Sequence, residues 1–104
     1  MARDRLDLQD ELEALRLGKV YYQPPASVRL IYPCIIYDDA RSEVTYASNR
    51  AYTITHQYTI TYVSKDPDDA HNSIKKIVRA FEMCNHDRSY VADNLNHEVF
   101  SLFY

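Results

Sequence analysis

Residues 51–63 read AYTITHQYTITYV and decide the fold. Every second position from Tyr52 to Tyr62 is aromatic or aliphatic apart from His56, and the positions between them are threonines and one glutamine. A period of two is that of a β-strand, whose successive side chains point to opposite faces. We predict one long strand with an apolar face against a helix and a threonine face turned to water or another subunit. On the apolar face, His56 is expected to be a hydrogen-bonded core residue.

A helix is predicted directly after this strand, from Pro67 to about Met83. Asp66 can cap it, Pro67 suits its first position, and Asp68 and Asp69 oppose the helix dipole. The apolar residues between positions 70 and 81 fall on one stripe, so one side of the helix should pack on the sheet. A metal site could be imagined at the three aspartates, but helix capping accounts for them.

The first helix is predicted from about Asp4 to Leu17. Leucines recur at helical spacing at positions 8, 12 and 15, and Gly18 follows as a stop. Leu6 and Leu17 fall on the other side of the helical wheel, which hints at contacts on both faces of this helix.

The stretch between the first helix and the long strand predicts shorter strands. The segment Val20–Tyr22 ends at Pro24-Pro25, which cannot donate to a ladder. The run Cys34–Tyr37 is apolar on both sides of the pleat, as in a central strand. A polar turn is predicted at Asp38–Ser42, before a short strand around Val44–Tyr46.

Two further strand-like runs close the chain, on either side of the turn formers Asp93 and Asn94. The predicted fold is therefore α+β, with a mixed, mainly antiparallel sheet and two helices packed against it. Residues 1–104 are expected to form a single domain, made of an N-terminal helix (1–18) and an α+β core (19–104).

The composition argues against nucleic-acid binding, nucleotide binding and a membrane-spanning protein. A net charge of -3 provides no basic field for nucleic acid, and a single glycine, Gly18, cannot build a phosphate-binding loop. Cys34 and Cys84 lack CxxC spacing and suit reduced thiols in a cytoplasm. No apolar signal segment or membrane span is apparent, so we expect a soluble protein.

The polar residues that could form a catalytic or metal site concentrate near the end of the chain: Cys84, His86, Asp87, Asp93 and His97. Their spacing is not that of a zinc site. A hydrolase could be written with His86, Asp93 and His97, or with Cys84 or Ser89 as nucleophile, but nothing supplies a nucleophile elbow or an oxyanion loop. We expect no enzyme activity, no cofactor and no metal.

Tyrosine is unusually frequent, with ten Tyr against three Phe and no Trp. Half-buried sheet faces account for much of this, because tyrosine has a high β propensity. Contact with a partner is the second interpretation, since tyrosine tolerates both water and burial.

Residues 87–104, DRSYVADNLNHEVFSLFY, look like the ending of a family of small tail proteins encoded among the head–tail connector genes of long-tailed bacteriophages. Its members close with D-R-x-[YF]-x-[AS]-D-N-L-[NY]-H-x-V-F and a final aromatic pair. YPCIIY (32–37), YASNRAY (46–52) and KDPD (65–68) also match that family's motifs in order. The resemblance covers about Tyr32 to Tyr104.

This resemblance implies a tail completion, or tail terminator, protein of a phage or prophage. Such proteins form hexameric rings that cap the head-proximal end of the tail tube and dock to the head connector. The implied partners are further copies of the chain, the major tail tube protein and a head completion or connector protein. The implied location is the neck of the virion, assembled in the host cytoplasm, with DNA passing through the ring without specific binding.

Contacts between subunits, or with the tube, are predicted at the two polar connections 38–42 and 87–94, through Asp38, Asp39, Arg50, Asp87, Arg88 and Asp93. The isolated protein is expected to be monomeric or weakly associated and to close into a ring, of six copies, on the tube end. Two alternatives stay open. One is another neck protein, such as a head completion protein, whose relatives are more often helical bundles or small β-barrels. The other is the small hydrolase.

Overall fold

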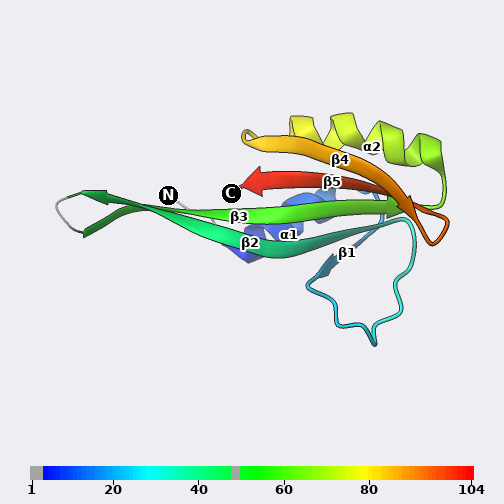
Figure 1. Cartoon of the computed structure of the whole chain (residues 1–104), viewed down its shortest axis with the longest axis horizontal. Coiled ribbons are helices and arrows are strands. Elements are labelled where there is room, and N and C mark those ends of the chain that lie inside the picture. The colour runs from blue at the N-terminus through cyan, green and yellow to red at the C-terminus, as the bar shows by residue number, and fades with distance from the viewer. Residues whose placement is uncertain (1–3, 48–49) are drawn as a thin grey trace.

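The computed structural model describes residues 4–47 and 50–104, and of residues 41–55 it describes the backbone alone. These residues form two helices and a five-stranded sheet, as Figure 1 shows. In chain order the elements are α1 (Arg5–Ala14), β1 (Lys19–Tyr22), β2 (Cys34–Ala47), β3 (Arg50–Ser64), α2 (Pro67–Ala80), β4 (Cys84–Ala92) and β5 (Leu95–Phe103).

The sheet has the strand order β1-β2-β3-β5-β4. β1 runs parallel to β2, and the other neighbouring strands are antiparallel. The predicted α+β class, with a mixed and mainly antiparallel sheet, is therefore confirmed. The long strand predicted at residues 51–63 is β3, which lies in the middle of the sheet.

The two faces of the sheet differ in what covers them. On one face, Tyr37, Ile60 and Phe100 are neighbours across β2, β3 and β5, and all three are fully buried. We call this the covered face, because both helices lie on it. On the other side the same strands align Ile36, Thr61 and Val99. We call this the open face, since no helix within residues 4–47 and 50–104 lies over it (Figure 1).

Both helices contribute to a single core on the covered face. Leu8 and Leu12 of α1 are completely buried, and so is Ile77 of α2. Each such side chain contributes about 1.5–3 kcal/mol by leaving water. The core also takes in residues of the strands, namely Ile35, Tyr37, Tyr58, Ile60, Tyr62, Cys84, Phe100, Leu102 and Tyr104. The N-terminal helix is thus an integral part of the core.

α1 is shorter than predicted. The Asp4 side chain caps its start by accepting a hydrogen bond from the Leu6 N–H at 3.2 Å, but the helix ends at Ala14 and not at Leu17. Arg16 takes a left-handed conformation with φ 55°, which turns the chain toward β1. Gly18 is required at its place, because a Cβ there would lie 2.2 Å from the Pro33 carbonyl oxygen.

α2 begins as predicted and ends earlier. The Asp66 side chain accepts from the Asp68 N–H at 2.9 Å, and Pro67 is the first helical residue. The helix stops at Ala80, because Phe81 is already extended and leads the chain into β4. Phe81 is half-buried and meets Tyr104 edge to face, with ring centroids 6.2 Å apart.

The polar turn predicted at Asp38–Ser42 is wrong. β2 continues through these residues to Ala47, with a register shift between Asp39 and Arg41 that leaves Ala40 as a bulge. The strand persists because β3 is long enough to pair with it throughout. Its sequence need not alternate between apolar and polar residues, because this part of β2 continues past the end of β1 and lies at the edge of the sheet.

The polar connection predicted at residues 87–94 is wrong in the same way. Residues 87–92 belong to β4, the edge strand, with a register shift between His86 and Arg88. The turn itself consists of Asp93 and Asn94, with φ values of 53° and 61°, which suit the two residues of a tight hairpin. Polar residues and a bulge are typical of an edge strand, because they discourage unwanted pairing.

β2 and β3 extend beyond the rest of the sheet as a two-stranded arm (Figure 1). β5 ends opposite Gln57, and from Ser42↔His56 to Ala47↔Arg50 the ladder of β3 runs with β2. The molecule accordingly measures 51 × 30 × 24 Å along its principal axes.

Candidate functional site

The structure separates the six predicted contact residues. Asp38 and Asp39 are consecutive in β2 and therefore lie on opposite faces of the sheet. Asp38 is half-buried on the open face, where burial, and then the neighbouring Asp39, raise the pKa of its carboxyl. Asp39 lies on the covered face and accepts a hydrogen bond from the Tyr22 hydroxyl at 2.5 Å.

Asp87 and Arg88 lie together at the bulge of β4. The Asp87 carboxylate accepts a hydrogen bond from the Ser101 hydroxyl, and the Arg88 guanidinium carbon lies 5.7 Å from the centre of the Tyr90 ring. Arg88 pairs with Val99, which places it on the open face. Asp93 lies apart, in the β4–β5 turn, and Arg50 begins β3 with a side chain outside the described residues.

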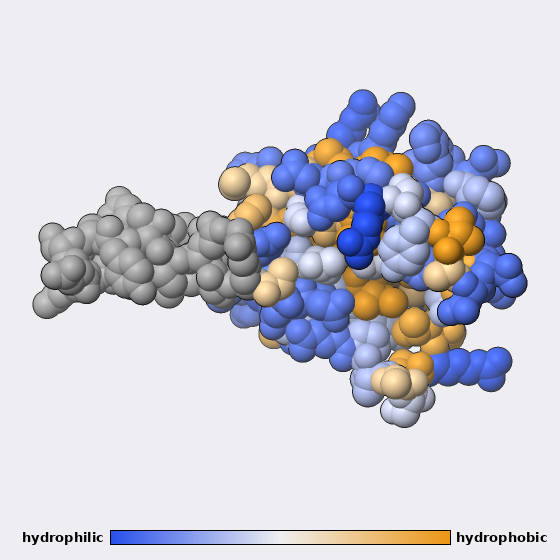
Figure 2. Space-filling model, in the orientation of Figure 1, coloured by the Kyte–Doolittle hydropathy of each residue, from blue (hydrophilic) through white to orange (hydrophobic). Residues whose placement is uncertain are grey.

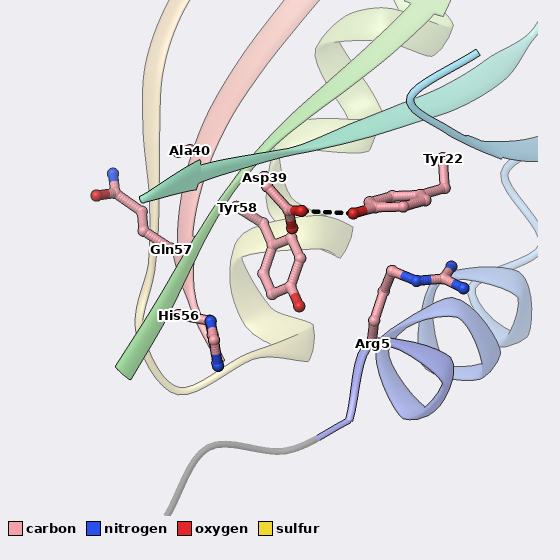
Figure 3. Close-up of a pocket in the computed structure, with 7 residues that line it drawn as sticks. All are labelled: Arg5, Tyr22, Asp39, Ala40, His56, Gln57 and Tyr58. Carbon is pink, nitrogen blue, oxygen red and sulfur yellow. Dashed lines mark hydrogen bonds between the residues drawn. The ribbon is translucent and has the colours of Figure 1, made fainter. Parts of the chain in front are cut away.

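A pocket of about 420 Å³ lies on the covered face at the root of the arm (Figure 3). The lining comes from α1, β1, β2 and β3 and consists of Arg5, Tyr22, Asp39, Ala40, His56, Gln57 and Tyr58. Of the six predicted contact residues, Asp39 is the one that reaches it. His56, expected in the core, is half-buried and lines this pocket.

The charged groups of the pocket hold its tyrosines in place. Arg5 lies with its guanidinium carbon 4.2 Å above the Tyr22 ring and donates to the Tyr37 hydroxyl at 3.0 Å. Tyr37 in turn donates to the Gln9 side-chain oxygen at 2.5 Å. The hydrogen bond to Asp39, more than burial, raises the pKa of Tyr22 to about 12. These contacts hold α1 on the sheet. Among the described residues of the lining there is no Ser, Thr or Cys.

Ser89, His86 and Glu98 form a polar cluster between β4 and β5. Glu98 is buried and accepts hydrogen bonds from the Ser89 hydroxyl and, at 2.7 Å, from His86 Nε2. The Ser89 oxygen lies 3.3 Å from that same nitrogen. In a serine relay the acid and the nucleophile use different ring nitrogens. The observed geometry therefore holds the edge strand to β5 and does not form a relay.

The residues named for a hydrolase do not converge in the structure. His86 lies beside Phe100 on the covered face, with ring centroids 5.2 Å apart. His97 lies on the open face, stacked on Tyr90 at 4.5 Å, and Asp93 is in the turn. These residues are close in the sequence, but side chains along a strand point alternately to opposite faces, so those of His86 and His97 lie on different sides of the sheet.

The open face has the composition of a contact surface. The stack of Tyr90 on His97, with Arg88 near it, adjoins the buried Val99, and Ile36 lies on the same face two strands further on, beyond Thr61. Figure 2 looks onto this face and shows hydrophobic residues exposed between hydrophilic ones. Tyr and Arg are enriched in protein interfaces, where an aromatic body is buried beneath a polar rim. Sequence alternation on β3 predicts this face. The sequence also predicts a strand-like run before Asp93, but it assigns residues 87–94 to a polar connection, so the stack of Tyr90 on His97 does not follow from it.

Both cysteines are buried free thiols. Burial raises the pKa of each to about 11, which keeps the sulfur protonated and unreactive at neutral pH. Among the described residues, no group of three or more His, Cys, Asp or Glu side chains is arranged to hold a metal ion. Neither described helix is long and apolar enough to cross a membrane.

Comparison with known proteins gave no assignment: no family model and no curated protein matches this sequence.

Proposed function

We propose that this chain is a structural subunit of a phage virion that completes the tail. In this role, copies of the chain form a ring, of six subunits, on the head-proximal end of the tail tube. The ring stops polymerisation of the tube and joins it to the head completion or connector protein. The proposal is for a binding role and not for an enzyme.

The four ordered sequence motifs between Tyr32 and Tyr104 carry this proposal. Three of them have definite structural tasks in the described part of the fold. YPCIIY (32–37) opens β2, KDPD (65–68) caps α2, and the motif at 87–104 forms β4, its turn and β5. A relative with the same sheet would need the same motifs to start β2, to cap α2 and to form the β4–β5 hairpin. The shared order of the motifs therefore supports a shared fold.

The distribution of contacts on the sheet supports a ring subunit. A ring requires a patch on each copy that matches a different patch on the next copy. The open face offers an aromatic and polar surface on one side, and the helices present charged surfaces on the other. A mainly antiparallel sheet with helices also fits a tail completion protein better than the helical bundles or small barrels of head completion proteins.

The charge of the chain suits a ring through which DNA moves. A net charge of -3 gives no general attraction for phosphates, so the genome could pass without being retained. Specific binding of nucleic acid is not part of the proposal.

Electron microscopy of lysates from a phage or prophage lacking this gene tests the proposal. Loss of a tail terminator should give tails of abnormal length that do not join heads. Tails of normal length that remain unattached would instead indicate a neck protein on the head side. Normal numbers of infectious particles in the absence of the gene would refute both roles.

A further inference from the structure

The outward face of α1 combines an exposed leucine with carboxylates. Leu6 is 57% exposed, although Leu8 and Leu12 of the same helix are completely buried. Asp10 and Glu13 follow Leu6 at the spacing of one and two turns, on the same face, and both are exposed. Residues 4–14 contain five carboxylates against one cation, Arg5. An apolar side chain beside charges of one sign is the pattern of an anchor with a charged rim.

The outward face of α2 has the complementary properties. A depression of about 170 Å³ lies on it, lined by His71, Asn72, Ile74 and Lys75. Arg79 follows Lys75 by one turn and is exposed. The first turn of α2 carries Asp68 and Asp69, but residues 70–80 contain three cations and no carboxylate, so the surface beyond the first turn is positive where α1 is negative. It also offers a hollow where α1 offers a projecting leucine.

The two surfaces lie on different parts of the molecule. Both helices pack on the covered face, with α1 beside β1 and α2 over β3, β4 and β5 (Figure 1). Tyr104 lies between them, since its hydroxyl donates to Glu11 of α1 and its ring meets Phe81 beyond α2. Two distinct patches that match each other produce head-to-tail association, which yields a closed ring when the rotation per copy permits closure.

We infer that α1 of one copy docks on α2 of the next copy in the ring. Leu6 enters the depression beside Ile74, and Asp10 and Glu13 face Lys75 and Arg79. The inference rests on the proposed function, because it names the contact that would join neighbouring subunits. The partner is a second copy of this chain. The exposed charges contribute register and partner choice, and the leucine contributes the buried contact.

A charge-swap experiment tests this contact. One variant carries Asp10→Lys and Glu13→Lys, and a second carries Lys75→Glu and Arg79→Glu. Each is expressed in cells in which the phage gene is deleted, and infectious particles are counted. Either variant alone brings like charges together at every contact, so the yield should fall on the order of tenfold or more. When both variants are expressed together, every junction of an alternating ring pairs opposite charges, and the yield should recover.

Matched controls separate the contact from folding and from the proposed function. Lys19→Glu with Arg29→Glu changes the net charge as the α2 variant does, at exposed positions outside both helices, and should leave the yield unchanged. Thermal unfolding of each purified variant checks that it folds. Carbodiimide cross-linking of tails assembled with mixed ¹⁵N-labelled and unlabelled protein should join α1 carboxylates to Lys75 between copies.

The outcomes distinguish the two ideas. If folded single variants support normal yields, or if co-expression fails to restore the yield, the α1–α2 contact is wrong and the tail-completion role still stands. If particles form normally without the gene, the proposed function is wrong, and the inferred α1–α2 contact in a ring is refuted together with it.

Discussion

The covered and open faces of the sheet are made by the same strands and yet differ in what holds them. On the covered face, large apolar side chains such as Phe100 are fully buried beneath two helices. On the open face, Thr59 and Thr61 are half-buried, and the aromatic row at Tyr90 and His97 is reached by solvent. The open face also holds buried side chains, Cys34, Val63 and Val99, but the largest ones, such as Tyr37 and Phe100, lie on the covered face, which should therefore contribute more to stability.

The largest expected effect is that of Phe100→Ala. Phe100 is completely buried in the middle of the covered face, so the cavity should cost about 3–5 kcal/mol of unfolding free energy. Thr61→Ala, on the open face of the adjacent strand, should cost about 1 kcal/mol or less. Urea unfolding measures both. Equal losses would mean that the two faces share the core.

A smaller effect is expected for Tyr37→Phe, which keeps the ring and removes the hydroxyl. That hydroxyl accepts from Arg5 and donates to Gln9, so it fixes α1 on the covered face. We expect a loss of about 0.5–1.5 kcal/mol, because the hydrogen bonds of the hydroxyl are lost while Arg5 and Gln9, which are only partly buried, can turn to water. Hydrogen exchange should show faster opening of α1 than of α2. Equal exchange rates in both helices would show that the hydrogen bonds of the Tyr37 hydroxyl do not hold α1 in place.

Asp38→Asn should stabilise the protein slightly, and in a manner that depends on pH. Burial, with Asp39 beside it, raises the carboxyl pKa in the folded state, so the folded protein holds this proton more tightly than the unfolded chain does. Ionised Asp38 therefore lowers stability at pH values above its ordinary pKa of 3.8. The melting temperature of the Asn variant should exceed that of the parent at pH 7 and approach it below that pKa. A constant difference across this range would contradict the burial of the carboxyl.

The smallest effect on stability is expected for Arg88→Glu. Arg88 is exposed on the open face and contacts the Tyr90 ring at 5.7 Å, so its loss should change the melting temperature little. If the open face meets the tail tube or a neighbouring subunit, the same change should give abnormal tails by electron microscopy. Tyr90→Phe is a matched variant that keeps the stacked ring, and it should assemble normally. Normal tails from Arg88→Glu would show that the open face around Arg88 does not contact the tail tube or a neighbouring subunit.

The sequence predicted the parts of the fold in which burial imposes a period. β3 alternates because one of its faces lies under the helices, and α2 shows a stripe because one of its sides lies on the sheet. The polar parts of β2 and β4 carry no such signal. β2 continues past the end of β1, and β4 is an edge strand whose residues 85–91 are exposed. For this reason the sequence predicts a turn at residues 38–42, and a polar connection at residues 87–94 beside a strand-like run, where the structure has continuous strands.

The pocket at the root of the arm could not be predicted in the same way. It joins Arg5 to Tyr22 and Tyr22 to Asp39, and these residues come from three elements whose docking depends on the whole sheet. The sequence predicts Asp39 as a contact residue in a loop. In the structure Asp39 is part of β2, and it lines the pocket because its side chain points to the covered face and bonds to Tyr22. The bulge at Ala40 and the polar surfaces of the helices likewise follow from three-dimensional packing and not from local sequence.

The position of β5 bears on the order of folding. It is the last strand of the chain, yet it lies between β3 and β4, and its Phe100 and Leu102 occupy the centre of the core. β2 and β3 can form a hairpin early, because their pairing is local, whereas α1 has 10 residues and depends on packing against the sheet. The long-range closure must wait for β5, as the bond from Tyr104 to Glu11 spans 93 positions. Until β5 pairs with β3, the apolar face of β3 lacks Phe100 and Leu102 as neighbours, so a folding intermediate without β5 would expose apolar surface and be prone to aggregation.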